Sequence, residues 1–450
     1  KAEQSKVSNL AKLEKLEQAI ASFRSVDTLK AQISDLPEAD KLSVAHSQAV
    51  AAAEKMFLAL TTEQKDCLTI AEVEKAEAVF AEMKRILEAP IKDAEAKIDA
   101  IGEVTLERGE AVLTAQAAFN ALTPEQQAQV SNADKLQSAV AKLAALRKAV
   151  LTEKLDEPYK TTGDFMATLG TPTVNSIGGE WMVIGLARSG RTVPAGYYDN
   201  VVEYVKAMAD ANERLHRAKV TDNARVILAL TAIGKDVTNV GGHNLLKGLD
   251  NMDYVQTQGI NGPIFTLIAL DSHNYPTMGD VTREKLIQVI LAAQLTDGGW
   301  DLSADKADPD MTAMAIQALA PYYKTNETVK AAVDKALEAL SALQRNDGGF
   351  GSWGTVNSES CDQVIVALTA LGIDPTTDSR FIKNGLTVLD ALAGFYVTGG
   401  GFRHTANGER NGMATEQGYY ALAAYYRYLN GQTRLYDMTD VTIQTGGSTV

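Results

Sequence analysis

The sequence repeats one short phrase six times, as Ile184-Gly185-Leu186, Leu228-Ala229-Leu230, Ile268-Ala269-Leu270, Gln317-Ala318-Leu319, Val366-Ala367-Leu368 and Tyr420-Ala421-Leu422. The final leucine advances by 40 to 54 residues from one copy to the next. A period of this length is typical of repeat architectures, in which no unit can bury its apolar face alone. The small residue before each leucine lets helices approach closely, so six such units predict a closed ring of helix pairs.

A second phrase alternates with the first and joins a glutamine to a glycine pair and an aromatic residue, as in Gln294…Gly298-Gly299-Trp300, Gln344…Gly348-Gly349-Phe350 and the weaker Gly400-Gly401-Phe402. The glycines permit a tight turn. The glutamine can hydrogen-bond exposed backbone at a helix end, and the aromatic ring can fill the gap between turns. We interpret this phrase as structural, and each repeat as a helix, a glycine turn and a second helix.

Composition sets broad limits on function. A chain of 450 residues predicts two or three domains. The net charge of −14 argues against nucleic acid and anionic membrane surfaces as partners. No apolar run approaches the ~20 residues that span a bilayer. The two cysteines, Cys67 and Cys361, fall in different expected domains, so a disulfide framework is not expected.

Residues 1–154 predict a helical-repeat spacer, because they lack Trp and Tyr and are rich in good helix formers. The segment after Phe57 returns after Phe119, and in both copies Thr before Glu-Gln predicts a helix end and a capped restart. The spacer thus holds two copies of about 62 residues and a partial one. Val7-Ser8-Asn9 resembles Val130-Ser131-Asn132, so we expect the chain to begin inside a repeat, as a piece of a longer protein.

The positions of proline and glycine predict the next two segments of the chain. Pro158 and Gly163 predict a boundary, after which residues 155–435 form the ring of six helix pairs. Residues 436–450 are expected to be a linker to a further C-terminal region.

The motifs resemble a known superfamily. Gln294, Gly298 and Trp300 resemble the QW motif of squalene and hopene cyclases, which implies an all-α protein with an α6/α6 toroid of the terpenoid cyclase and protein prenyltransferase type. More closely, the chain resembles the prenyltransferase/squalene-oxidase repeat domains of Gram-positive cell-surface proteins, through Gly178-Gly179-Glu180-Trp181, Asp308-Pro309-Asp310-Met311 and Asn357-Ser358-Glu359-Ser360-Cys361. This resemblance implies an extracellular, surface- or wall-attached location. A fold does not carry its chemistry with it.

Residues at the start of each inner helix should face the mouth of the ring, where concave sites form. The candidate binding residues there are Glu180, Trp181, Asp222, Arg225, Asn261, Glu359, Asp362, His404, Glu416, Gln417 and Tyr420, and the candidate catalytic residues are Asp308 and Asp310. Trp353 and Tyr419 are expected at the rim with them. Acidic residues at helix starts are equally explained as caps that complement the helix dipole.

Three chemistries fit these residues in part. Asp308 and Asp310 lie where class II cyclases place an Asp pair that protonates an alkene, but Met311 replaces the last Asp. Glu359 and Cys361 resemble part of the prenyltransferase zinc site, without the later histidine, so a buried structural cysteine is favoured over a zinc ligand.

The third chemistry is acid–base catalysis on a glycan by Glu180 with Asp310 or Glu416. We favour a non-catalytic toroid that binds a small molecule, a glycan or a protein. The family resemblance makes a corrinoid one candidate ligand, and zinc or a corrinoid are the possible cofactors. The alternative is a toroid enzyme of the cyclase, prenyltransferase or glycoside-active kind.

Overall fold

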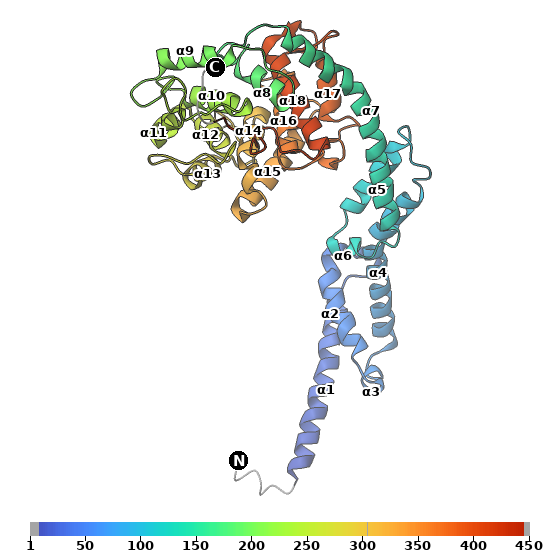
Figure 1. Cartoon of the computed structure of the whole chain (residues 1–450). Helices are drawn as coiled ribbons and strands as arrows, with labels where there is room; N and C mark the ends of the chain where they lie inside the picture. Colours follow the sequence, from blue (N-terminus) through green and yellow to red (C-terminus); the bar gives the residue numbers. More distant parts are fainter. Residues whose placement is uncertain (1–8, 304, 445–450) are drawn as a thin grey trace. The chain divides into compact units, whose positions relative to one another are not determined.

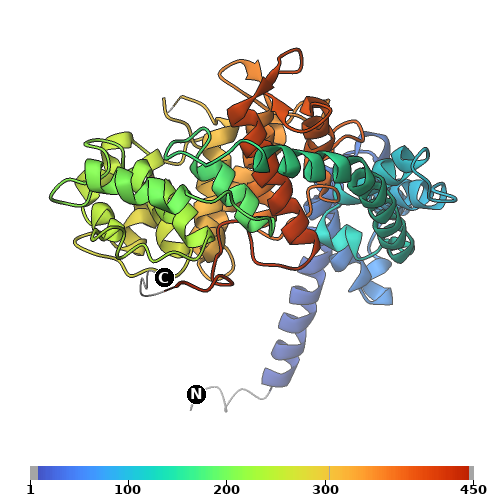
Figure 2. The ribbon, with the colours of Figure 1, turned by 45° about the horizontal axis from the view of Figure 1, so that its top comes forward.

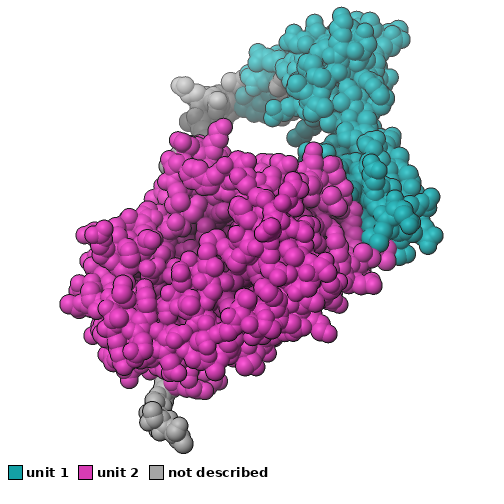
Figure 3. Space-filling view, turned by 90° about the horizontal axis from the view of Figure 1, so that it is seen from above, with its two compact units in different colours: residues 1–143 teal, residues 144–450 magenta. Residues whose placement is uncertain are grey.

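The computed structural model describes residues 9–303 and 305–444. Val7 and Ser8, which support the predicted start inside a repeat, lie outside the described residues, as do residues 445–450 of the predicted linker. The chain forms two compact units, Lys1–Leu143 and Ala144–Val450 (Figure 3). Among the described residues, no helix is long and apolar enough to cross a membrane.

The first unit is a tandem array of helices (Figure 1). Its helices are α1 (Leu10–Asp35), α2 (Ser47–Leu58), α3 (Thr62–Lys65), α4 (Ile70–Asp99), α5 (Gly109–Asn120), α6 (Pro124–Gln127) and the start of α7 (Ala133–Ala167). One core lies between α1, α2 and the first half of α4, from Val26 to Met83. A second core, from Ile91 to Leu143, joins the rest of α4 to α5 and α7. Because α4 belongs to both cores, it connects the two bundles.

The capped restarts of this unit are confirmed. Thr61 and Thr123 each accept a hydrogen bond from the backbone N–H three residues on, and the Gln64 and Gln126 side chains accept one from the capping threonine's N–H. In contrast, Pro158 does not end a helix, because α7 runs unbroken to Ala167. The prediction that Pro158 separates two helical regions is wrong. An internal proline costs one backbone hydrogen bond, and stacking of the adjacent Tyr159 ring on two other tyrosines compensates for this loss.

The second unit is the toroid, built on a closed ring of six inner helices. These are α8 (Glu180–Arg188), α10 (Val220–Ala232), α12 (Asn261–Asp271), α14 (Pro309–Leu319), α16 (Ser358–Ala370) and α18 (Gly412–Leu429). Each packs on the next, and α18 returns to pack on α8, which closes the ring. All six copies of the apolar phrase lie in these helices and are buried. The predicted all-α toroid is therefore confirmed.

An outer layer precedes the inner helices along the chain. It consists of the second half of α7, α9 (Tyr197–Met208), α11 (Met252–Val255), α13 (Arg283–Ala292), α15 (Glu327–Leu343) and α17 (Val388–Phe395). Short 3-10 helices add Ala39–Lys41, Val44–His46, Leu245–Leu249, Gln256–Gln258, Ala320–Tyr322 and Ser379–Phe381. In the described chain, the strands form two hairpins, β1 (Gly351–Ser352) with β2 (Thr355–Val356) and β3 (Phe402–Arg403) with β4 (Arg410–Asn411).

The glycine turns make the contacts that the sequence pattern predicts. The Gln294 Nε2 donates to the carbonyl oxygen of Gly298 at 2.7 Å and to that of Ala332, in the next outer helix, at 2.8 Å. Gln344 makes the equivalent pair of bonds one repeat later. The Trp300 side chain is fully buried and donates to the Ile290 carbonyl at 2.7 Å. These residues join successive repeats.

The C-terminal segment, residues 432–444, lies across the ring at the C-terminal ends of its inner helices; we call it the strap. Figure 2 shows it in dark red, leading from α18 toward the marked C-terminus. Two buried arginines, Arg188 and Arg427, share the carboxylate of Asp440 at 2.8 and 2.6 Å. The described part of the predicted linker therefore packs against the ring.

Backbone hydrogen bonds complete this attachment. The Met438 N–H donates to the Ser272 carbonyl at the end of α12, at 2.7 Å, and the Gln444 N–H donates to Gly234 after α10, at 2.9 Å. The strap thus contacts the C-terminal ends of several inner helices. The N-terminal ends form the opposite mouth of the ring.

Candidate functional site

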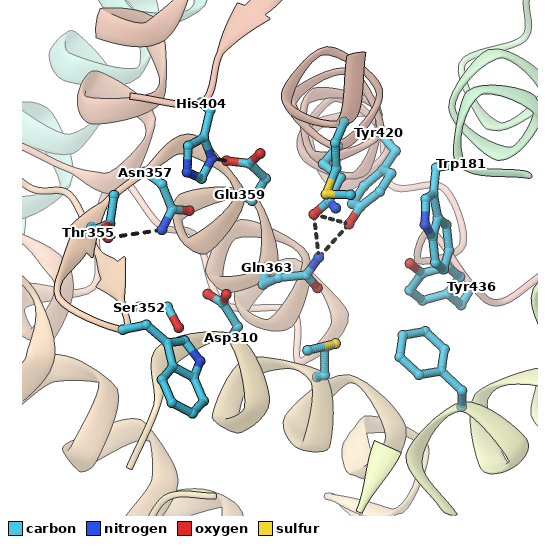
Figure 4. Close-up of a pocket in the computed structure, with 15 residues that line it drawn as sticks. Trp181, Asp310, Ser352, Thr355, Asn357, Glu359, Gln363, His404, Tyr420 and Tyr436 are labelled. Atoms are coloured by element: carbon cyan, nitrogen blue, oxygen red, sulfur yellow. Dashed lines mark hydrogen bonds and ion pairs between the residues drawn. The ribbon is translucent and has the colours of Figure 1, made fainter. Parts of the chain in front are cut away.

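A cavity of about 410 Å³ lies among the first turns of the inner helices (Figure 4). Its walls come from α8, α12, α14, α16 and α18, the two hairpins and the strap. The lining residues are Trp181, Phe265, Asp310, Met314, Ser352, Trp353, Thr355, Asn357, Glu359, Gln363, His404, Met413, Gln417, Tyr420 and Tyr436. Because Tyr436 belongs to the strap, the strap contributes one residue to the lining.

One side of the cavity is aromatic. Figure 4 shows Trp181, Tyr420 and Tyr436 on one side of the view, away from the carboxylates of Asp310 and Glu359. The Trp181 ring lies 5.9 Å, centroid to centroid, from both Phe265 and Tyr420. These are ordinary distances for interacting aromatic pairs. We call Trp181, Phe265, Tyr420 and Tyr436 the aromatic wall.

A network of amides separates the aromatic wall from the carboxylates. The Gln363 Nε2 donates to Gln417 Oε1 at 2.9 Å and to the Tyr420 hydroxyl. The Tyr420 hydroxyl donates in turn to Gln417 Oε1 at 3.1 Å. Deeper in the ring, Gln317 Nε2 donates to Gln363 Oε1 at 3.0 Å. These bonds hold the three lining side chains in fixed orientations.

The second hairpin brings a histidine to the mouth. The His404 Nδ1 lies 2.8 Å from Glu359 Oε2. The hairpin is held against the start of α16 because the Ser358 hydroxyl donates to the Arg403 carbonyl at 2.8 Å and the Ser358 N–H donates to His404. Glu359 therefore has a partner within the site.

Asp310 differs from the other lining carboxylate in its surroundings. Its Oδ1 is buried and accepts no hydrogen bond of ordinary geometry within the described residues, although the Ser360 hydroxyl lies close to the carboxyl group. Burial raises the pKa of Asp310 to about 7, and the charges of Asp308 and Glu359 add to this, while the Ser360 hydroxyl and His404 offset part of it. Near neutral pH, the cavity thus contains a carboxyl group that changes protonation state.

Asp308, the other candidate acid, has a structural role. It is the N-cap of α14, and its Oδ1 accepts the N–H groups of Asp310 and Met311, both at 3.0 Å. Its Oδ2 accepts the Ser352 hydroxyl of the first hairpin. Both oxygens are therefore used, and Asp308 does not line the cavity.

A separate group of charged residues lies at the starts of α8 and α10. Glu180 is fully buried, and burial raises its pKa to about 7 although the Arg225 Nε donates to it at 2.9 Å. Arg225 also lies 3.3 Å from Asp222. Glu416 accepts the Gly178 N–H at 2.6 Å, and burial raises its pKa to about 7 as well. Asn261 begins α12.

The structure brings together six of the residues singled out from the sequence as lining residues: Trp181, Asp310, Glu359, His404, Gln417 and Tyr420. The others, Asp308, Glu180, Asp222, Arg225, Asn261, Asp362 and Glu416, lie outside the lining. Asp362 is fully buried, neither of its oxygens is hydrogen-bonded within the described residues, and burial raises its pKa well above the ordinary value.

The two rim aromatics have different positions. Trp353, at the tip of the first hairpin, is 77% exposed and lines the cavity. Tyr419 is fully buried, donates to the Ser189 hydroxyl at 2.9 Å and stacks on Tyr159. The expectation that Tyr419 lies at the rim is therefore wrong, because its side of α18 packs on α7 and α8.

Sequence reasoning missed the deeper layer of the site. Phe265, Met314 and Gln363 each follow a candidate mouth residue by four positions, so they share its helix face one turn further in. That spacing was a usable signal. Tyr436 comes from the strap, and no pattern in the sequence places it in the ring.

The residues do not fit a zinc site. In the part of the chain that the structure describes, no group of three or more His, Cys, Asp and Glu side chains is arranged to hold a metal ion. Cys361 is fully buried, its thiol donates to the Asn357 carbonyl at 3.6 Å, and burial strongly raises its pKa. It does not line the cavity with Glu359. A thiolate ligand at this position would first have to lose its proton in an apolar environment.

Comparisons with known proteins give distant structural likenesses. No protein-family model and no curated protein matches the chain. The ent-copalyl diphosphate synthase from Streptomyces platensis is similar at 19% identity and a TM-score of 0.36, over 90% of this chain and 91% of that one. A possible member of the GH105 family from Salmonella enterica subsp. enterica serovar Paratyphi A is similar at 11% identity and a TM-score of 0.28, over 77% of this chain and 95% of that one.

Proposed function

We propose that the toroid binds a small organic ligand in the cavity described above, without chemical conversion, as part of a bacterial cell-surface protein. The surface location comes from the sequence resemblance alone. Binding is supported by one observation above all: the cavity combines an aromatic wall with the carboxyl group of Asp310. Ligand sites are commonly concave and largely apolar, with a few polar groups that fix orientation.

The charge of the lining restricts the ligand. The ionisable groups that line the cavity are Asp310, Glu359 and His404 together with two tyrosines, and this described set includes no Lys or Arg. A diphosphate needs cationic or N–H donors, as Arg and Lys provide elsewhere. The lining therefore disfavours isoprenoid diphosphates. A glycan offers hydroxyl groups and a corrinoid side chain offers amide groups, so both remain candidate ligands.

One observation favours a second candidate, an enzyme that uses Asp310 as an acid. Its pKa of about 7 suits proton transfer to a heteroatom near neutral pH. Protonation of an alkene requires a much stronger acid, and Met311, which is buried, replaces the residue that would complete an acid pair. If the protein is such an enzyme, Asp310→Asn should abolish its catalytic activity while the fold stays intact.

A thermal-shift panel tests the proposal on the full chain. The panel contains oligosaccharides, corrinoids, isoprenoid diphosphates and zinc with and without chelator. A ligand at 100 times its Kd stabilises by about 2.7 kcal/mol, which raises the Tm visibly. We expect a shift with a glycan or a corrinoid that Trp181→Ala removes and Asp222→Asn, outside the lining, retains.

Two results would contradict the proposal. A shift that survives Trp181→Ala would place the ligand outside this cavity. Conversion of a panel compound, detected by mass spectrometry and lost in Asp310→Asn, would establish the enzyme instead.

A further inference from the structure

The electrostatics of the cavity point to a class of ligand. We infer that the cavity selects ligands that carry an ammonium group, which lies beside Asp310, next to an apolar body, which lies against the aromatic wall. This inference rests on the proposed function, because it names the ligand of the same cavity. Three independent features of the site support it.

The first feature is the sign of the charge. Asp310 and Glu359 line the cavity, and Asp308 lies close enough for its charge to act on Asp310. The His404 Nδ1 lies 2.8 Å from Glu359 Oε2, so the Glu359 carboxylate already has a partner within the site. The site therefore carries excess negative charge when Asp310 is ionised. The chain as a whole also favours cations, with a net charge of −14.

The second feature is the unsatisfied oxygen. Asp310 Oδ1 is buried without a hydrogen bond in the described residues, and such groups are costly in folded proteins. A primary ammonium group has three donors and a full charge, and from the cavity it could donate a charge-assisted hydrogen bond to the Asp310 carboxylate, which lines the cavity. A neutral hydroxyl would supply one weaker bond, and a carboxylate or phosphate would be repelled.

The third feature is the separation of polar and aromatic surfaces. Figure 4 shows Asp310 and Trp181 in different parts of the cavity, with Gln363 between them. The amide network keeps Gln363 and Tyr420 bonded to each other, so these groups need no polar partner from the ligand. An aromatic or aliphatic body can therefore lie on the wall while its amine reaches Asp310. Trp and Tyr rings also attract a nearby cation.

Calorimetry with three matched probes tests the inference: 2-phenylethylamine, the neutral 2-phenylethanol and the anionic 3-phenylpropanoate. All three carry a phenyl ring on a short chain and differ mainly in the charge of the head group. At pH 8, where Asp310 is ionised, we expect the amine to bind about 10- to 100-fold more tightly than the alcohol, as a charged hydrogen bond allows. The carboxylate should bind more weakly than either.

Two variants assign the effect to Asp310. Asp310→Asn should reduce the affinity for the amine to that for the alcohol. Asp222→Asn removes the same charge from the first turn of α10, outside the lining, and should leave the preference intact. A preference that persists in Asp310→Asn, or disappears in both variants alike, would overturn the assignment.

Acidification gives a second readout. Asp310 is faced by Asp308 on its own helix, by Glu359 and Asp362 on α16, and by His404 on the second hairpin. Below pH 7, protonation of Asp310 should weaken amine binding by up to about 10-fold per pH unit, with no such change in Asp310→Asn. An affinity for the amine that does not change between pH 8 and pH 6 would contradict the inference.

The outcomes separate this inference from the proposed function. If the alcohol and the amine bind equally, the cavity binds ligands but does not select cations. If no phenyl probe binds while a panel ligand does, the amine inference is wrong and the proposed function stands. If no probe and no panel ligand binds, both are wrong.

Discussion

An acidic residue in the first turn of a helix has opposite properties in the two units. In the first unit, Glu72 is partly exposed and completes the capping box of α4: its Oε2 accepts the Thr69 N–H at 2.7 Å, and this bond lowers its pKa. In the toroid, Asp310 begins α14 beside a cavity with one oxygen unpartnered, and burial raises its pKa to about 7. Both residues occupy a position that the helix dipole favours for an anion.

The difference shows that burial outweighs the dipole. A helix terminus stabilises a surface carboxylate by about 0.3–1 kcal/mol, which is less than one pKa unit. Burial without a partner shifts a carboxyl pKa by up to several units in the other direction. A position at a helix start therefore does not decide the role of an acid: in the ring, Asp308 is a cap, whereas burial beside the cavity makes Asp310 a candidate for function.

The largest expected effect comes from breaking the turn that positions Asp310. The Trp300 side chain is fully buried. The backbone N–H of Trp300 donates to the Thr312 hydroxyl at 2.9 Å, and its backbone carbonyl accepts the Asp308 N–H at 3.0 Å. Trp300→Ala should lower the free energy of unfolding by about 3–5 kcal/mol, measured by chemical denaturation. A loss below about 1 kcal/mol would show that the turn does not hold α14 in place.

The next effect comes from removing the buried charge. The folded pKa of Asp310 lies above its ordinary 3.8, so its contribution to stability is full below pH 4 and is lost as the pH rises through 7. Asp310→Asn should therefore stabilise the protein at pH 8, on the order of 2 kcal/mol, and have little effect at pH 4. Urea denaturation at both pH values measures this, with Asp222→Asn as control. Equal effects at the two pH values would contradict the raised pKa.

In the first unit, the pH dependence of the contribution of Glu72 to stability has the opposite sign. The lowered pKa of Glu72 means that its contribution is present above its ordinary pKa of 4.5 and is lost as the pH falls through the folded value. Thr69→Ala removes the cap and should destabilise the start of α4 by about 1 kcal/mol. Hydrogen exchange of the first turn of α4 should then be several-fold faster at neutral pH. Unchanged exchange would show that the cap does not hold this turn.

The smallest expected effect concerns the hairpin tip at the cavity. Trp353 has φ +51°, in the left-handed region that favours Asn and Gly, and it is 77% exposed. Trp353→Asn should raise stability by about 0.5 kcal/mol or less and weaken any ligand that contacts the ring. If stability rises and affinity is unchanged, Trp353 is not part of the site.

The sequence predicted the ring well because its signal is periodic. Six copies of one apolar phrase mark the inner helices, and each of the turns at Trp300 and Phe350 is built from a local glycine motif. The helix break expected at Pro158 does not occur. The cost of a proline is a local effect, whereas the helix around it is held by packing against distant residues. Local rules thus predicted elements better than their ends.

The site was predictable only in part. Asp310, Glu359 and His404 were identified by type and position, but nothing local distinguishes Asp310 in the cavity from Asp308 in a cap. That difference depends on which helix face the ring encloses. Tyr436 reaches the cavity because the strap folds back across the ring, a long-range contact with no sequence pattern.

The most direct test of the difference between Asp310 and Glu72 is a carboxyl NMR titration of the full chain labelled with ¹³C in Asp and Glu. Asp310→Asn and Glu72→Gln assign the two signals. We predict that Asp310 titrates with a midpoint near 7 and Glu72 with a midpoint below 4.5, in the same sample. A midpoint near 4 for Asp310 would show that its carboxyl is hydrated or paired, and would contradict the account of the cavity given above.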